Sequence, residues 1–349
     1  MSALSDVTER HRFDTGRLQA YLATALPGFT GPLEVKQFQG GQSNPTYLLT
    51  TPARRYVMRS KPGPVARLLP SAHAIEREFR VMRALAAQGI PVPEMLLLCE
   101  DEEVIGRAFF LMAHVDGRVL WDPSLPGMTP PLRGAVYDEM NGVIAALHGV
   151  DPAAAGLDDF GRAGNYFERQ IGRWSRQYRA SETGRIEAMD RLIDWLPANV
   201  PAGEETAVVH GDYRLDNLIF HPTEPRVLAV IDWELSTLGH PLADFSYLCM
   251  GWHIPPGAFR GIAGLDHAAL GIPSEAQFIA SYCQRTGRSG IANWNFYLAY
   301  NLFRIAAILQ GVYKRALEGI ASADNALAAG ENTKALAAIG WRYAEKSGR

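Results

Sequence analysis

The chain has 349 residues, which is enough for two domains or for one enzyme built as two lobes. Hydrophobic residues make up 47% and charged residues 20%, which is typical of a globular protein and excludes a disordered or collagen-like chain. The 34 Lys and Arg residues against 37 Asp and Glu give a formal net charge of −3, so no overall positive charge recruits nucleic acid or an anionic membrane.

Three further features bear on where the protein works. The N-terminal residues contain no basic segment followed by an apolar run, so we expect no secretory signal. The longest apolar stretch, residues 296–313, contains Asn301, Arg304 and Gln310, which predicts a buried helix and no membrane span. Three scattered cysteines are too few for a disulfide framework, so a reducing, cytoplasmic environment is predicted.

The first part of the chain alternates between strand and helix patterns. Short β-rich runs at residues 45–50 and 55–59, separated by a turn, predict two antiparallel strands. Between residues 75 and 85 apolar side chains recur at spacings of four and three, which predicts a helix with Ser71 as its cap. Residues 107–115 are predicted to form another strand.

After a proline-rich turn the pattern becomes mainly helical. Helices are predicted at residues 131–149, 164–181, 185–196, 275–286, 293–317 and 333–346. One β segment, residues 207–232, interrupts them and is expected to form a hairpin-like insert. The chain is therefore divided into a helical extension at 1–32, an α+β lobe at 33–115 and a mostly helical lobe at 116–349.

Three polar residues beside apolar runs form the strongest chemical signal. Asp212 and Asn217 stand five residues apart on a loop, and Asp232 ends the next apolar run. Phosphoryl transfer from a nucleotide needs a carboxylate to orient the acceptor hydroxyl, and an amide and a second carboxylate to hold Mg²⁺. We predict that Asp212 has the first role, and that Asn217 and Asp232 hold the metal, because Mg²⁺ prefers oxygen ligands.

These residues lie within two longer motifs. His-Gly-Asp-x-x-x-x-Asn at 210–217, followed by Ile-Asp-Trp-Glu at 231–234, resembles the aminoglycoside phosphotransferase and choline kinase branch of the protein-kinase-like fold. The resemblance extends over residues 39–250. It implies an α+β fold with a small β-rich nucleotide-binding N-lobe and a larger, mainly helical C-lobe. It also implies a kinase that uses Mg²⁺ with ATP or GTP and phosphorylates a small molecule.

The resemblance also assigns residues to the nucleotide. The implied binding residues are Gly40, Gly41, Ser43, Asn44, Arg59, Glu78, Met112 and His114. Glu78 is expected to pair with a basic residue on the third strand, where the family has lysine and this chain has Arg59. Lys61 lies two residues further on the same strand face and is the alternative. His210 and Asp244 are expected to support the loop that carries Asp212.

Two other functions compete with a kinase. His210, Asp212, Asp232 and His240 could instead be the ligands of a metal-dependent hydrolase, but this reading leaves the glycine-rich loop, Arg59 and Glu78 without a purpose. The missing lysine suggests a non-catalytic, nucleotide-binding pseudokinase. Because all three predicted catalytic residues are present, we rank catalysis above this alternative.

The acceptor is predicted from charge and from a second resemblance. Residues 293–349 contain four acidic and seven basic residues, a net +3 that opposes a polycation such as an aminoglycoside. The runs at 41–47 and 68–73 resemble those of kinase domains attached to acyl-CoA dehydrogenases, which act on hydroxyacyl-CoA. The expected partner is thus a small hydroxylated molecule, with no nucleic acid and no membrane.

Overall fold

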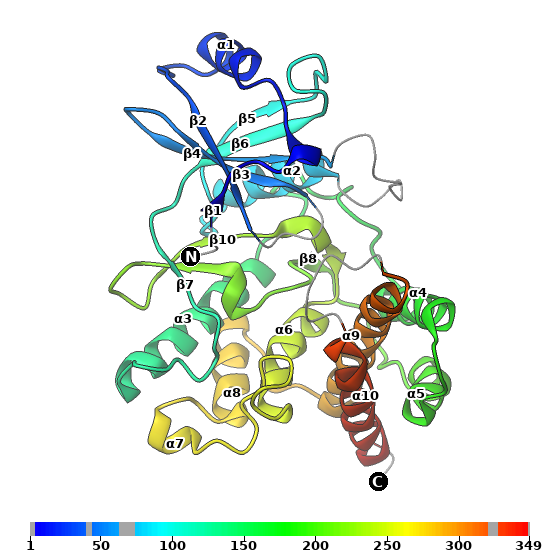
Figure 1. Ribbon diagram of the computed structural model, residues 1–349. Coiled ribbons are helices and arrows are strands. Elements are labelled where there is room, and N and C mark those ends of the chain that lie inside the picture. The colour runs from blue at the N-terminus through cyan, green and yellow to red at the C-terminus, as the bar shows by residue number, and fades with distance from the viewer. Residues whose placement is uncertain (1–3, 40–43, 63–73, 320–326, 348–349) are drawn as a thin grey trace. The chain divides into compact units, whose positions relative to one another are not determined.

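The computed structural model describes residues 4–39, 44–62, 74–319 and 327–347 (Figure 1). The predicted glycine-rich loop at Gly40, Gly41 and Ser43, the cap at Ser71 and the run at 68–73 lie outside these residues. The chain forms two compact units. The N-terminal unit consists of Met1–Val119, Ala155–Leu157 and Asp216–Ser236, and the C-terminal unit consists of Leu120–Ala154, Asp158–Leu215 and Thr237–Arg349.

The N-terminal unit is built on an antiparallel sheet with the strand order β1-β2-β3-β4-β6-β5. Its strands are β1 (Leu4–Ser5), β2 (Glu34–Phe38), β3 (Thr46–Thr50), β4 (Arg55–Ser60), β5 (Met95–Cys99) and β6 (Phe109–Ala113). Thr46 on β3 stands opposite Arg59 on β4, so the predicted antiparallel pair is confirmed. The predicted strand at 107–115 is β6, which lies next to β4.

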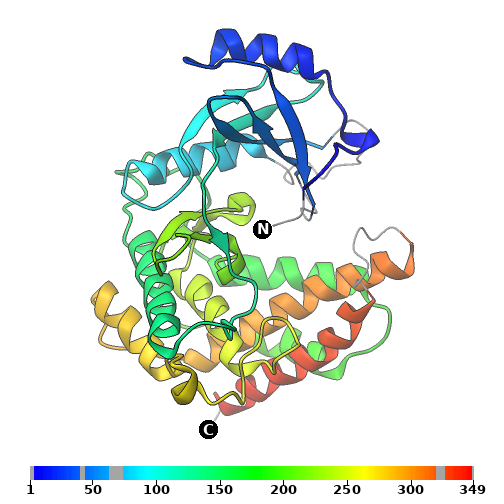
Figure 2. The same cartoon turned by 60° about the vertical axis from the view of Figure 1, so that its left-hand side comes forward.

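Two helices cover opposite faces of this sheet (Figures 1 and 2). Leu18 and Leu22 of α1 (Thr15–Ala25), which follows the short η1 (Glu9–His11), are buried in a core with Met58 of β4. On the other face, Phe79 of α2 (Ile75–Ala86) lies 6.2 Å from Phe110, measured between ring centroids. Because successive side chains of a strand alternate, Arg59 points away from the core of Met58 and toward α2.

The same unit contains a second sheet of three short strands, in the order β10-β9-β7. These are β7 (Arg118–Val119), β9 (Leu218–Phe220) and β10 (Val227–Val230), with η2 (Leu215–Asn217) before β9 and η3 (Trp233–Leu235) after β10. A Cβ atom at Gly117 would lie 2.4 Å from the backbone oxygen of Phe220, so only glycine allows the chain to pack this closely on β9.

The predicted hairpin insert is confirmed for β9 and β10 and is wrong for the strand before them. β8 (Ala207–Val209) pairs with β11 (Thr237–Gly239), in the C-terminal unit. β8 is buried along its whole length, and three apolar residues carry no periodicity that would reveal a partner. Its partner comes after the hairpin and was not recognised as a strand.

The C-terminal unit is mostly helical. Its helices are α3 (Pro130–His148), α4 (Tyr166–Ser181), α5 (Glu187–Ala198), α6 (Pro241–Cys249), η4 (Met250–His253), α7 (His267–Leu270), α8 (Glu275–Thr286), α9 (Trp294–Leu317) and α10 (Ala328–Lys346). All six predicted helices are present, and the α+β class is confirmed. The sequence did not reveal α6, because this helix is buried on nearly every side and therefore has no polar face.

Helix α9 is the centre of this unit, and α10 runs beside it in both views (Figures 1 and 2). Three of its polar side chains, Asn301, Arg304 and Gln310, are buried. The amide of Asn301 donates to the backbone of Ala243 at 2.9 Å, and that of Gln310 donates to the backbone of Ser181 at 2.9 Å. The buried helix predicted here is confirmed. No helix in the described ranges has both the length and the apolar character needed to span a membrane.

Candidate active site

Arg59 is the centre of an ion cluster in the N-terminal unit. Its Nε lies 3.3 Å from a carboxylate oxygen of Glu78 on α2. One terminal nitrogen lies 2.9 Å from Asp232 Oδ1 and 3.1 Å from Glu234 Oε2. The guanidinium group has donors on several sides, and it therefore pairs with three carboxylates that the chain supplies from two distant segments.

The cluster holds more negative than positive charge. Glu78 is buried and accepts a hydrogen bond from the amide of Asn44 at 3.0 Å. Burial, helped by the nearby carboxylates of Asp232 and Glu234 and opposed by Arg59, raises the pKa of Glu78 to about 7. Because the cluster has one arginine and three carboxylates, it is suited to bind a further cation.

Lys61, the alternative basic residue, is used differently. Its ammonium group forms an ion pair with Glu76, two residues before Glu78 on α2. Arg59 and Lys61 therefore pair with different glutamates of α2, and Arg59 also lies beside Asp232.

The β9–β10 hairpin brings Asn217 and Asp232 together. Leu218 pairs with Val230, and the backbone N–H of Ile231 donates to the backbone oxygen of Asn217 at 2.9 Å. Asp232 has a φ of 67°, a left-handed conformation that is uncommon for residues other than glycine, and strained backbone of this kind clusters at functional sites. An amide and a carboxylate at one hairpin end are oxygen donors that fit Mg²⁺.

The 210–214 loop belongs to the C-terminal unit and is held by Asp244 of α6. The carboxylate of Asp244 accepts the backbone N–H groups of His210 at 2.7 Å and Gly211 at 2.9 Å. Burial opposes ionisation, but hydrogen bonds from His148 and from the His210 backbone lower the pKa of Asp244. Gly211 has a φ of 82°, which favours glycine at this position. The predicted support by Asp244 is confirmed.

Two side chains that the sequence did not single out contact Asp212. The hydroxyl of Tyr247 donates to Asp212 Oδ1 at 2.6 Å, and Arg214 Nε lies 3.0 Å from Oδ2. Burial and the charge of Asp212 raise the pKa of Tyr247 well above its ordinary value, so Tyr247 remains a neutral donor. The carboxylate of Asp212 is thus fixed from both sides.

Arg304 of α9 supports the same loop. Its guanidinium group is buried and donates to the backbone oxygen of Gly211 at 2.5 Å. It also lies 5.1 Å from the ring centroid of Tyr247 and 5.7 Å from that of Trp174. A charged residue in the middle of an apolar helix was the signal that could have identified it. Arg304 is one of the seven basic residues counted between 293 and 349 for the acceptor, but its charge acts on the 210–214 loop.

The two histidines of the hydrolase alternative have structural partners. His210 Nδ1 accepts the backbone N–H of Asp212 at 3.2 Å, and His240 Nδ1 accepts that of Leu242 at 3.2 Å, at the start of α6. Burial lowers the pKa of His240 to about 4, so its ring is neutral at physiological pH. These contacts favour the predicted supporting role of His210 over metal ligation.

The neutral state of His240 predicts a pH dependence of stability. Because folding lowers the pKa of His240 from 6.5 to about 4, its stabilising contribution is complete above pH 6.5 and is lost as the pH falls toward 4. In urea denaturation, the free energy of unfolding of the wild type should fall by about 3 kcal/mol more than that of His240→Asn over this interval. Asparagine also caps a helix but does not titrate. His221→Asn serves as the control. Equal acid sensitivity of wild type and His240→Asn would refute this assignment.

The residues expected at the adenine lie at the end of β6. Met112 stands opposite Val57 of β4, and His114 follows the strand, with its backbone N–H donating to the backbone oxygen of Arg55 at 3.3 Å. Burial and the charge of Arg55 lower the pKa of His114. Their contact with a nucleotide stays a prediction.

Comparison with known proteins identifies the class. The profile of the phosphotransferase enzyme family matches residues 34–288. Acyl-CoA dehydrogenase family member 10 of Mus musculus is 51% identical over 321 residues, which are 91% of this chain but 30% of that protein. The chain therefore spans less than a third of the length of this curated relative.

Two solved structures are similar over almost the whole chain. One, from Ralstonia eutropha, carries the provisional designation aminoglycoside phosphotransferase; it is 61% identical, has a TM-score of 0.88, and covers 96% of this chain and 99% of its own. Spectinomycin phosphotransferase APH(9)-Ia, solved with ADP and spectinomycin, has a TM-score of 0.63 at 13% identity and covers 95% of this chain and 98% of its own.

The chain belongs to the phosphotransferase enzyme family. It is a kinase that transfers a phosphoryl group to a hydroxyl group of a small molecule. The protein-kinase-like fold predicted from the two motifs is confirmed by the solved structures.

Proposed function

We propose that this kinase transfers the γ-phosphoryl group of ATP or GTP, with Mg²⁺, to the hydroxyl group of a hydroxyacyl-CoA. The observation that carries the nucleotide and metal part is the ion cluster of Arg59, Glu78, Asp232 and Glu234. Its excess negative charge and the adjacent amide of Asn217 suit a divalent cation. Mg²⁺ would neutralise charge on the phosphate oxygens when bound by Asn217 and Asp232.

Arg59 and Glu78 would bind and orient the nucleotide. Glu78 holds the guanidinium group on the α2 side of β4, while the terminal nitrogen donates toward Asp232. Arginine can contact a carboxylate and phosphate oxygens at once, so it can replace the lysine expected at this position. An arginine with these contacts favours a catalytic kinase over a pseudokinase.

Asp212 would act on the acceptor. Its carboxylate orients the hydroxyl group and takes its proton as the oxygen attacks the γ-phosphorus, while the bond from that phosphorus to the β-phosphate oxygen breaks and the nucleoside diphosphate leaves. Tyr247 and Arg214 hold the carboxylate in one orientation, so the proton acceptor is positioned before the substrate binds.

The acceptor class rests on two observations. The curated relative is named as an acyl-CoA dehydrogenase family member, which suggests that the kinase part handles an acyl-CoA. Basic residues exceed acidic ones between residues 293 and 349, even with Arg304 set aside, and this disfavours polycationic acceptors.

The experiment is a turnover screen of the purified chain. Mg-ATP and Mg-GTP are paired with hydroxyacyl-CoAs, free hydroxy acids, sugars, choline-like amines and aminoglycosides, at low and moderate salt. We expect phosphorylation of hydroxyacyl-CoA, weaker at higher salt because screening reduces the charge attraction. Efficient phosphorylation of an aminoglycoside, with no activity on any anionic hydroxyl compound, would overturn the acceptor assignment.

Arg304 provides a test of how the loop is positioned. Arg304→Met should lower kcat by up to about 100-fold, since a small displacement of an oriented group has effects of this size, with little change in nucleotide KM. Arg304→Lys should recover part of kcat, because lysine can still donate to the Gly211 oxygen. Arg315→Met, an exposed arginine of the same helix, is the matched control. An unchanged kcat in a folded Arg304→Met variant would refute the positioning role.

A further inference from the structure

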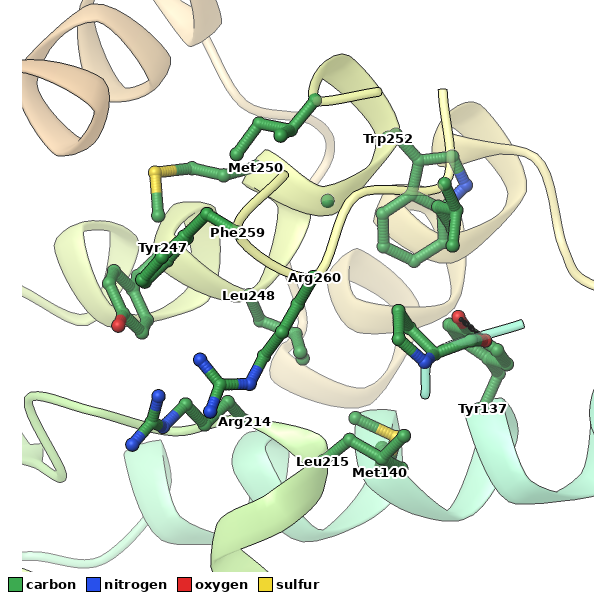
Figure 3. Close-up of a pocket in the computed structure, with 14 residues that line it drawn as sticks. Tyr137, Met140, Arg214, Leu215, Tyr247, Leu248, Met250, Trp252, Phe259 and Arg260 are labelled. Carbon is green, nitrogen blue, oxygen red and sulfur yellow. Dashed lines mark hydrogen bonds between the residues drawn. The ribbon is translucent and has the colours of Figure 1, made fainter. Parts of the chain in front are cut away.

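A cavity of about 60 Å³ lies in the C-terminal unit, and the roles proposed above for nucleotide binding and proton transfer do not use it. Arg214 and Tyr247, which both contact Asp212, are among its lining residues. Its other walls come from α3, from the end of α6 with η4, and from the 254–262 loop (Figure 3). A molecule in this cavity would therefore contact the two side chains that hold the carboxylate we assign to the acceptor hydroxyl.

The walls present mainly apolar surface to the cavity, although several of the wall residues carry polar atoms. The hydroxyl of Tyr137 donates to the backbone oxygen of Pro123 at 2.7 Å, and the indole N–H of Trp252 donates to that of Pro273 at 2.9 Å. The hydroxyl of Tyr247 donates its hydrogen bond to Asp212. These aromatic residues thus offer mainly carbon surface to an occupant, which favours an aliphatic chain. The volume is well above the roughly 10–15 Å³ that a single water needs, so the cavity admits a short aliphatic segment.

The charged residues that line the cavity are two arginines, Arg214 and Arg260. Their guanidinium groups point toward the same end of the cavity, where Tyr247 also lies (Figure 3). Asp212 reaches the same end through its ion pair with Arg214. Two like charges directed at one place favour an anionic group of the occupant and disfavour a cation.

The loop before Ile262 is built to hold Arg260 in this position. Arg260 has a φ of 57°, which is uncommon for a non-glycine residue. The loop is closed by backbone hydrogen bonds from Ile262 to Gly251 at 2.8 Å and from Ala263 to Ile254 at 2.9 Å. A Cβ atom at Gly261 would lie 2.0 Å from the oxygen of Ile254, so the loop closes tightly directly after Arg260. Backbone strain of this kind is concentrated at functional sites.

We infer that this cavity is the subsite for the aliphatic chain of an anionic hydroxyl acceptor, and that Arg260 is the residue that selects the anion. The inference rests on the proposed function, because it places the acceptor beside Asp212. The shared chemistry is a short aliphatic chain with a negative charge, carried either by a carboxylate or by the phosphates of a coenzyme A thioester. Arg260 determines specificity and takes no part in the proton transfer.

The first test measures binding without turnover. Unhydroxylated carboxylates from butyrate to decanoate, and their coenzyme A thioesters, are titrated calorimetrically into the full chain without nucleotide. Affinity should rise about fourfold for each added methylene until the cavity is filled, and then level off. Arg260→Met should weaken binding by about 10- to 100-fold, and Arg260→Lys by less, because it keeps the charge.

Filling the cavity supplies the second arm. Leu248→Phe should remove the gain in affinity for longer chains while leaving the shortest ones nearly unchanged, and Met140→Phe is a second filling variant should the first not fold. The matched control is Arg226→Met, an exposed arginine of the N-terminal unit. An Arg260 effect in either ligand series supports the inference and shows which anion is recognised. The inference is overturned if affinity does not depend on chain length. It is also overturned if the Arg260 and cavity-filling variants bind both ligand series with wild-type affinity.

The kinetic arm separates this inference from the proposed function. With an acceptor from the turnover screen, Arg260→Met should raise the acceptor KM about 10- to 100-fold and change kcat little. If wild type binds the aliphatic anions as expected but phosphorylates no hydroxyl compound, the proposed function fails and the subsite stands. If wild type phosphorylates an acceptor and the Arg260 and Leu248 variants keep its KM, the subsite inference fails and the kinase assignment stands.

Discussion

Replacing Asp212 with alanine is expected to lower kcat by about 10²–10⁴-fold, the range found for a positioned general base. Nucleotide affinity should stay at the wild-type value, because Asp212 acts on the acceptor hydroxyl. Asp212→Asn should show a similar loss, since the amide can still accept the hydrogen bond from Tyr247 but cannot take a proton. Steady-state kinetics with the acceptor from the turnover screen, together with Mg-nucleotide calorimetry, measures both quantities.

Asp138→Ala is the matched control for this prediction. Asp138 is an exposed carboxylate of the same unit and forms an ion pair with Arg285. It should keep wild-type kcat and nucleotide affinity. An Asp212→Ala variant with undiminished kcat would show that another group accepts the proton.

Replacing Asp232 should instead abolish binding of the metal-nucleotide complex. Affinity for Mg-ATP is expected to fall by at least about 100-fold, since even residues one step removed from a metal contribute 10- to 100-fold. Asp232→Asn is the preferred variant, because asparagine tolerates the left-handed backbone at this position. Arg59 keeps Glu78 and Glu234 as partners, so the cluster should not leave an unpaired buried charge.

The measurement is calorimetry with ATP and GTP, each with and without Mg²⁺. The difference between wild type and Asp232→Asn should shrink when Mg²⁺ is left out, because the lost carboxylate is then no longer needed as a ligand. Glu224→Ala, an exposed carboxylate in the turn of the same hairpin, is the matched control. An equal loss of nucleotide affinity in the Asp212 and Asp232 variants would contradict the two roles.

The sequence by itself determined the elements that have a local signature. Helices such as α8 and α9 were predicted because their apolar pattern lies within one segment. Asp212, Asn217 and Asp232 were identified in the same way, since a motif of polar residues after short apolar runs is readable along the chain. Their roles remain predictions, but their residue types and spacing are sufficient to indicate phosphoryl transfer.

Only the tertiary structure decided which groups act together. Asp232 reaches Arg59 from 173 positions away, and Tyr247 and Arg304 were recognised only once folding placed them at the loop that carries Asp212. Arg260 was recognised only as a lining residue of the cavity. The unpredicted strand pairing of β8 has the same origin. Charge interactions and the burial that raises the pKa of Glu78 depend on distance through space and on exclusion of water, and neither quantity is encoded in the spacing of residues along the chain.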